Sequence, residues 1–177
     1  MVSIAELHSV YQAFERAVEE YGPRPFLRVP ADSAKDYSDS AIEYSYEETK
    51  IRVDQLIVGY AARRLEPGDR VALAMRNYPE WMAAFIGVTS IGAVIVPVNS
   101  WGQPADIAYT VEDAGAKLAL CDQQRYDGVA ERFRDKGIET FLARPTENGH
   151  PQSWRRLPTA PFARPFTTWN APRSPLP

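Results

Sequence analysis

The sequence predicts an α/β fold with a doubly wound, mostly parallel sheet flanked by helices. From residue 70 onward, short apolar runs alternate strictly with segments of helical periodicity, which is typical of parallel strands joined by right-handed crossovers. The run at 93–98 is apolar at every position, and this favours a central strand buried on both faces. Together these observations indicate a parallel sheet covered by helices.

Before residue 70 the sequence predicts a helix, a strand pair and a second helix. The first helix ends at Gly22, and its apolar stripe has members three and four residues apart: Ile4, Leu7, Tyr11, Phe14, Val18 and Tyr21. The β-like runs 26–29 and 42–46 flank a polar loop and are expected to pair antiparallel. Ser45 stands three before Glu48, the spacing of a capping box, and opens a helix with these core-facing residues: Val53, Leu56, Tyr60, Ala61 and Leu65.

The remaining elements form the sheet and its helices, which complete a domain over residues 1–143. Strands are predicted at 70–75, 93–98, 117–121 and 138–143. Helices are predicted at about 79–91, 104–114 and 124–136, and their start signals are Asn77 with Pro79, Pro104 and Asp122.

Residues 144–177 differ in composition from the rest of the chain. They hold eight of the fifteen prolines and five arginines against one glutamate, and they contain no Ile, Val, Tyr, Asp or Lys. Because such a segment buries too little apolar surface to offset its ordering entropy, we expect a Pro/Arg-rich linker or disordered tail.

The stretch 81–98 carries no charged side chain, and its eighteen residues are close to the ~20 needed to span a bilayer. A single helix is disfavoured because Gly87 and Gly92 lower helix propensity and Pro97 would break the last turn. No basic cluster flanks the stretch to orient it. We therefore expect a buried helix, a stop at Gly92 and a buried strand, with no transmembrane segment.

Composition excludes several classes of protein. A formal net charge of −3 provides no basic surface for nucleic acid. The single cysteine, Cys121, rules out an internal disulfide and fits a reducing compartment. The first twenty residues lack a basic start followed by an apolar run, so no secretory signal is expected. These features favour a cytoplasmic protein.

The motifs of the chain do not predict a complete nucleotide or metal site. The segment GVTSIG at 87–92 matches the first six positions of a phosphate loop, but Ala93 and Val94 replace the lysine and the hydroxyl residue that would follow. A helix end is the better interpretation. His8 and His150 have no second ligand at metal spacing, and we interpret both as surface residues.

Other polar residues are expected to have structural roles. Five carboxylates fall at helix caps, first turns or exposed faces: Asp69, Glu80, Asp106, Glu112 and Asp113. Cys121 ends an apolar strand, and the sequence places no base near it. Asn77 and Asn99 follow strands and would line any crevice there, but capping or turn formation is the favoured explanation. We predict no catalytic, cofactor-binding or metal-binding residue in this chain.

Motifs in the order found here resemble the adenylate-forming acyl-CoA synthetase family. Its members have a Thr-Tyr or Ser-Tyr before a long helix, a Gly-Asp-Arg-Val strand, an Asn with Pro-Glu-Trp, and a Gly-Ala strand that ends near an Asn. Here these stand at Ser45–Tyr46, Gly68–Val71, Asn77 with Pro79–Trp81, and Gly92–Asn99. The segment VNSWGQPADIAYTVEDAGAKLALCD resembles the branch that activates fatty or related carboxylic acids. The resemblance implies the N-terminal part of the large domain of such an enzyme.

The resemblance also implies an ATP-dependent acid:CoA ligase. Such enzymes form an acyl-adenylate from a carboxylic acid and ATP with Mg²⁺, and then pass the acyl group to coenzyme A. The family's T-S-G-T-T-G-x-P-K-G phosphate loop, its Y-x-x-G-D aspartate and its C-terminal lysine are absent from the sequence, and the context of that lysine is not found at Lys35, Lys50, Lys117 or Lys136. Adenylation needs cations and N–H groups around the phosphates, so we expect the chain to be inactive alone.

We therefore expect a truncated fragment of an acid:CoA ligase. The segment QSWRRLP at 152–158 resembles the family, but the residues from about 165 do not, which indicates an interrupted reading frame. Translating the downstream DNA in the other frames would test this hypothesis. The alternative is a stand-alone α/β binding or interaction module without catalysis. A partial sheet leaves apolar surface uncovered, which also predicts self-association.

Overall fold

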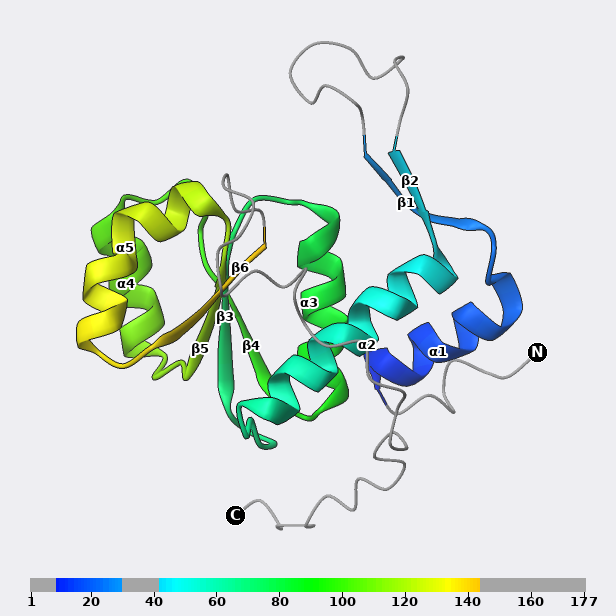
Figure 1. Ribbon diagram of the computed structural model, residues 1–177, viewed down its shortest axis with the longest axis horizontal. Helices are drawn as coiled ribbons and strands as arrows, with labels where there is room; N and C mark the ends of the chain where they lie inside the picture. Colours follow the sequence, from blue (N-terminus) through cyan, green and yellow to red (C-terminus); the bar gives the residue numbers. More distant parts are fainter. Residues whose placement is uncertain (1–8, 30–41, 144–177) are drawn as a thin grey trace, which may run out of the picture.

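The computed structural model describes residues 9–29 and 42–143 (Figure 1). Within these ranges the order of elements is α1 (Val10–Tyr21), β1 (Pro25–Val29), β2 (Ile42–Ser45), α2 (Tyr46–Ala62), β3 (Arg70–Ala74), α3 (Pro79–Ser90), β4 (Val94–Pro97), α4 (Pro104–Asp113), β5 (Leu118–Cys121), α5 (Gln123–Asp135) and β6 (Glu139–Leu142). The strands and helices predicted after residue 70 are confirmed, with ends that differ by at most one residue. The predictions for Ile4, Leu7, His8, His150 and the tail 144–177 lie outside the described residues.

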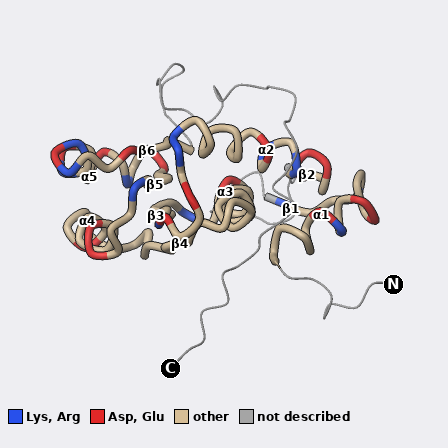
Figure 2. The backbone as a smooth tube through the Cα atoms, turned by 90° about the horizontal axis from the view of Figure 1, so that it is seen from below, with Lys and Arg blue, Asp and Glu red and all other residues tan. Residues whose placement is uncertain are grey.

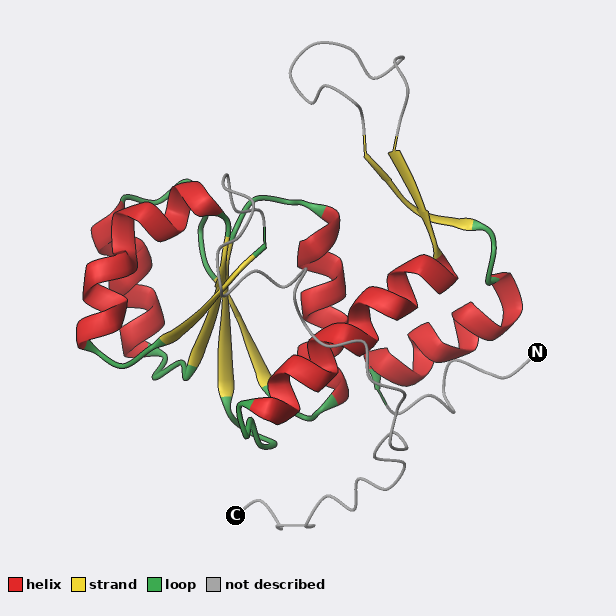
Figure 3. Cartoon of the chain, viewed as in Figure 1, coloured by secondary structure: helices red, strands yellow, loops and turns green. Residues whose placement is uncertain are grey.

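Four parallel strands form the main sheet in the order β4-β3-β5-β6, and β1 pairs with β2 in a separate antiparallel hairpin. Helices lie on both faces of the sheet (Figure 3). On one face, Val71 and Leu73 of β3 and Met75, which directly follows β3, pack in a core with side chains of α1, α2 and α3. On the other face Ala72 and Ala74 pack with α4 and α5. The predicted doubly wound α/β class is confirmed.

The direction of winding reverses next to β3. The chain passes from β3 to β4 on one side, and then returns through α4 to β5 on the other side of β3. In an open α/β sheet, a crevice forms beyond the carboxyl ends of the strands at such a reversal. The β3/β5 boundary is therefore the place where the fold itself favours a ligand site.

The uncharged stretch 81–98 divides as the sequence predicts. α3 ends at Ser90, and Gly92 adopts φ +72°, a left-handed conformation that glycine tolerates and that stops the helix before β4. Figure 2 shows charged residues along α5, whereas α3 carries charge only at Glu80 in its first turn. Among the described residues, the structure contains no helix that combines the length and apolarity of a membrane span.

The prediction that the strand at 93–98 is central and buried on both faces is wrong for the described part of the chain. β4 is an edge strand, Val94 is 48% exposed, and Ile95 and Val96 are only half-buried. Apolar composition reports which side chains favour burial, but strand pairing decides which of them are covered. Pro97 fits this edge. The N–H groups of Val94 and Val98 donate to the carbonyls of Asp69 and Leu73, so the N–H groups of the odd-numbered residues of β4 point away from β3. The sheet therefore does not need the N–H that Pro97 lacks.

The helix after Ser45 begins as predicted and differs at one core position. The Ser45 hydroxyl accepts from the N–H of Glu48 at 3.1 Å, and the Glu48 carboxylate accepts from the N–H of Ser45 at 2.8 Å. Val53, Leu56 and Tyr60 are buried, Leu65 is half-buried, and Ala61 is exposed, which corrects the prediction. Ala61 follows Tyr60 by one residue and so lies about 100° around the helix from it.

Candidate functional site

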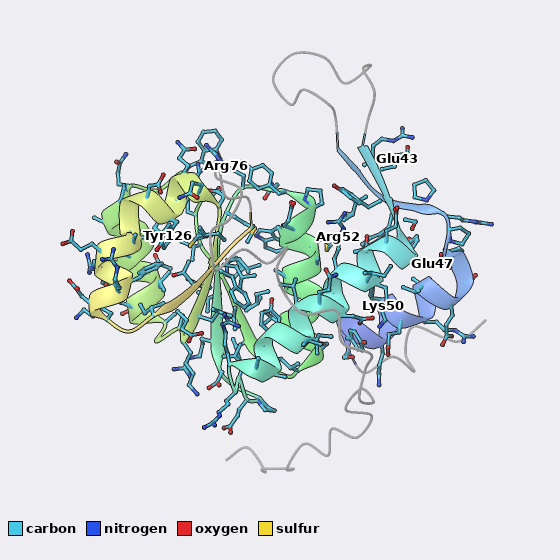
Figure 4. The ribbon with its side chains drawn as sticks, viewed as in Figure 1. Glu43, Glu47, Lys50, Arg52, Arg76 and Tyr126 are labelled. Atoms are coloured by element: carbon cyan, nitrogen blue, oxygen red, sulfur yellow. The ribbon has the colours of Figure 1, made fainter. Side chains whose placement is uncertain are left out.

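The carboxyl ends of the sheet strands bring together three loops that carry charged and aromatic side chains. The segments that follow β3, β4 and β5 lead into α3, α4 and α5, so the three helices begin at this edge (Figure 1). Figure 4 labels Arg76 at this edge, close to the end of the sheet. We describe this site by four residues: Arg76, Trp101, Asp122 and Arg125.

Asp122 and Arg125 form a buried ion pair at the start of α5. Their side chains are 5% and 7% exposed, and Nη1 of Arg125 lies 3.2 Å from Oδ2 of Asp122. Oδ1 of Asp122 also caps α5 by accepting from the N–H of Arg125 at 3.0 Å. Because burial of a charge is costly unless it is paired and hydrogen-bonded, these contacts explain how the pair is tolerated.

The same pair ties the three loops together. Oδ2 of Asp122 accepts from the backbone N–H of Arg76 at 3.1 Å, which joins the ends of β3 and β5. Nε of Arg125 donates to the carbonyl of Ser100 at 2.8 Å, which joins the loop after β4. The positions of Arg76 and Trp101 are therefore set by hydrogen bonds that converge on one buried pair.

The guanidinium of Arg76 stacks on Trp101. Cζ of Arg76 lies 3.0 Å from the centroid of the Trp101 ring, and Trp101 is 78% exposed. Such cation–π contacts are stabilising, and they leave the N–H groups in the guanidinium plane available for hydrogen bonds. Nη1 of Arg76 is buried, and it has no hydrogen-bond partner within the part of the chain that the structure describes.

The two asparagines that the sequence places at this edge have the expected positions and modest roles. Asn99 is exposed, and its Oδ1 accepts from the N–H of Trp101 at 3.0 Å, so it shapes the turn that presents the Trp101 ring. Asn77 is also exposed and does not cap α3, because the N-cap of that helix is Tyr78. Turn formation, the favoured explanation, is confirmed for Asn99.

Cys121 lies beside this site but is inaccessible. The thiol is buried at the end of β5, and burial, together with the charge of Asp122, raises its pKa. A buried thiol with a raised pKa forms little thiolate, so Cys121 is not suited to act as a nucleophile.

The carboxylates considered from sequence are spread over the domain. Asp69 pairs with Lys117 at 2.7 Å near the amino ends of β3 and β5, and the hydrogen bond from Lys117 lowers the pKa of Asp69. The hydrogen bond from Arg132 of α5 likewise lowers the pKa of Glu112 of α4. Asp106 accepts from the N–H of Gln103 at 3.2 Å at the start of α4, and Asp113 is exposed.

Glu80 is more buried than a first-turn carboxylate usually is, with 6% exposure. It lines a cavity that has room for about one water molecule. The other lining residues are Leu56, Met75, Leu120, Phe141 and Ala143. No group of three or more His, Cys, Asp or Glu side chains in the described ranges is arranged to hold a metal ion.

The roles of Arg76, Trp101 and Arg125 were not predicted from the sequence. A usable signal was present, since Arg76 is the first charged residue after the apolar strand and Asp122 precedes Arg125 by three positions at a helix start. Their convergence depends on the order of strands in the sheet, which the sequence pattern does not specify.

Comparisons with known proteins agree with the fold. The model of a family described as AMP-binding enzyme matches residues 14–163. A linear gramicidin synthase from Brevibacillus parabrevis is 33% identical over 125 residues, which cover 71% of this chain and 2% of that protein. The 4-hydroxybutyrate–CoA ligase 2 of Metallosphaera sedula is 28% identical over 114 residues, which cover 63% of this chain and 20% of that protein.

A solved structure shows the same architecture. The benzoate CoA ligase from Burkholderia xenovorans superposes with a TM-score of 0.72 at 19% identity, over 92% of this chain and 31% of that chain. The chain thus spans at most 20% of the length of the two curated relatives. Since the family model matches most of its residues, the chain belongs to the AMP-binding enzyme family.

Proposed function

We propose that this chain forms part of the scaffold of an acid:CoA ligase, which activates a carboxylic acid with ATP and transfers the acyl group to coenzyme A. The match of the family model to residues 14–163 carries the proposal, and the CoA ligase name of the Metallosphaera relative supports it. ATP, Mg²⁺ and coenzyme A are the expected ligands of the complete enzyme, and the acid belongs to the fatty or related carboxylic acids. A cytoplasmic location is part of this proposal, and cell fractionation would test it.

In this proposal the described residues position the site and do not perform the chemistry. The hydrogen bonds of Asp122 and Arg125 hold three loops at the carboxyl edge of the sheet, where a ligand crevice is favoured. The family's phosphate loop motif is absent from the 177-residue sequence. Because adenylation depends on groups that stabilise charge on the phosphates, we propose that the chain alone is inactive.

ATP–pyrophosphate exchange tests inactivity directly. The purified 177-residue chain is incubated with ATP, Mg²⁺, labelled pyrophosphate and a panel of aliphatic and aromatic acids, with 4-hydroxybutyrate–CoA ligase 2 as a positive control. We expect no acid-dependent label in ATP. Acid-dependent exchange by this chain contradicts the proposed inactivity.

A chimera tests the scaffold role. Residues 42–143 would replace the matching segment of the Metallosphaera ligase, and acyl-CoA formation would be measured. We expect measurable activity, and we expect Asp122→Ala in the chimera to lower it because that change releases the three loops. An inactive chimera that is folded by circular dichroism contradicts the scaffold role.

The exposed edge of β4 favours a second candidate function, a non-catalytic module that self-associates. Val94 is 48% exposed on this edge, and uncovered apolar strand edges promote association. Strand addition is restricted here because Pro97 cannot donate from its outward position. Light scattering after size exclusion would test the module: Val94→Lys should shift the chain toward monomer, whereas Ile51→Lys on α2, also exposed, should not. A chain that is monomeric before substitution contradicts self-association.

A further inference from the structure

The unpaired Nη1 of Arg76 is the feature of the carboxyl edge that the scaffold role leaves unexplained. The atom is buried and lacks an acceptor among the described residues. A buried charged donor without an acceptor is strongly destabilising, and native proteins pair such groups with protein, water or a ligand. We therefore expect an acceptor for this N–H, either a water molecule or a ligand atom.

The nearby carboxylate is already engaged. Asp122 accepts a hydrogen bond from the backbone N–H of Arg76. Both of its carboxylate oxygens also accept from Nη1 of Arg125, Oδ1 at 3.3 Å and Oδ2 at 3.2 Å. Arg125 has its own acceptors in Asp122, Ser100 and Gln124. The three charged groups Arg76, Asp122 and Arg125 therefore carry a net charge of +1, and the surplus resides on Arg76.

The place of Arg76 favours an anion. Arg76 follows β3 and is bonded to Asp122 after β5, at the boundary where the winding of the sheet reverses. α3, α4 and α5 begin at this edge, and their amino-terminal ends add positive partial charge, part of which is offset by Glu80, Asp106 and Asp122. Charge and position both favour an oxyanion at this edge.

We propose that the guanidinium of Arg76 binds one phosphate-type oxyanion, with Nη1 donating to a phosphate oxygen. Trp101 supports the flat face of the guanidinium and leaves its edge for the ligand. Nη1 is buried and Trp101 is 78% exposed, so the proposal requires the exposed Trp101 ring to shift when the oxyanion enters. This site does not depend on the proposed ligase function and exists in a non-catalytic module as well.

The test is a titration of the full chain with inorganic phosphate at constant ionic strength, followed by tryptophan fluorescence and by the midpoint of thermal unfolding. Arg76→Gln removes the proposed donor, and Arg76→Lys keeps the charge without the planar fork. Arg134→Gln removes an exposed charge from the last turn of α5 and serves as the matched control. Acetate at equal ionic strength distinguishes a carboxylate ligand from a phosphate.

We expect saturable binding of phosphate by the wild-type chain and the Arg134→Gln variant, and affinity at least about tenfold weaker for Arg76→Gln. Phosphate should also raise the unfolding midpoint only where Arg76 is intact, because ligand binding to the native state stabilises it. Equal responses of Arg76→Gln and Arg134→Gln overturn the site, as does the absence of saturation in the wild-type chain. Acetate binding as tight as phosphate binding overturns the ligand class.

A second measurement uses the wild-type chain alone, so it stands if Arg76→Gln fails to fold. Phenylglyoxal modifies accessible arginines, and peptide mass spectrometry reports the extent at each one. Phosphate should protect Arg76 from modification and leave Arg134 unprotected. Equal modification of Arg76 with and without phosphate overturns the proposal.

Discussion

Replacement of Asp122 by alanine should destabilise the domain more than a typical surface substitution. The change removes the cap of α5, the acceptor of the Arg76 N–H and the only carboxylate bonded to Arg125 among the described contacts. Loss of a cap costs about 1 kcal/mol, an unsatisfied buried N–H about 1–3 kcal/mol, and a broken buried ion pair about 3–5 kcal/mol. These effects overlap because they involve the same carboxylate, so the expected loss is about 3–5 kcal/mol in total.

Urea unfolding followed by circular dichroism measures this loss, provided that the dependence of the free energy on urea stays the same in wild type and variant. Asp122→Asn keeps an oxygen for the cap and removes the charge, so we expect a smaller loss. Arg125→Met removes the opposite charge, and the double variant completes a thermodynamic cycle with an expected coupling above about 1 kcal/mol.

If Asp122→Ala costs less than about 1 kcal/mol, the pair does not hold the three loops. If the two single changes add within about 0.5 kcal/mol, Asp122 and Arg125 act independently, and the network at the carboxyl edge is not a unit.

Three further predictions concern other parts of the domain. Tyr60→Phe should leave the free energy of unfolding unchanged or raise it by about 1 kcal/mol, because the buried Tyr60 hydroxyl has no partner among the described residues; a loss above about 1 kcal/mol in urea unfolding contradicts this. Gly115→Ala should lower the free energy of unfolding more than Gly137→Ala. Both glycines have positive φ, at +60° and +66°, but only at Gly115 would the new Cβ lie 2.8 Å from Arg70 Nη2. Equal unfolding midpoints for the two variants would show that this contact has no effect. The Asp69–Lys117 pair should stabilise the domain above the unfolded carboxyl pKa of about 3.9, and this stability should be lost as the pH falls through the lowered folded pKa of Asp69. Lys117→Met should therefore make the free energy of unfolding less dependent on pH in this range. An unchanged pH profile contradicts the role of the pair.

Much of the fold could be predicted because it depends on residues close in sequence. The capping box of Ser45 and Glu48 and the positive φ of Gly92 are local interactions, and both helix boundaries were predicted correctly. The alternation of apolar runs with helical segments specified a parallel sheet, because crossover connections have few solutions. Ala61 was one exception: the sequence analysis assigned it to the core next to Tyr60, but it lies about 100° around the helix from Tyr60 and is exposed.

The candidate site could not be predicted in the same way. Arg76, Trp101 and Arg125 belong to three loops separated by 25 and 24 residues, and their contacts arise only when β5 pairs with β3 on the side opposite β4. The exposure of Val94 has the same origin, because β4 becomes an edge through pairing and not through its own composition. The sequence by itself determined the elements, their order and the family resemblance, since these rest on short-range periodicity, capping and turn chemistry. Only the tertiary structure decided which strand lies at the edge and which charges meet at the carboxyl ends, because strand order is set by long-range packing that no local pattern encodes.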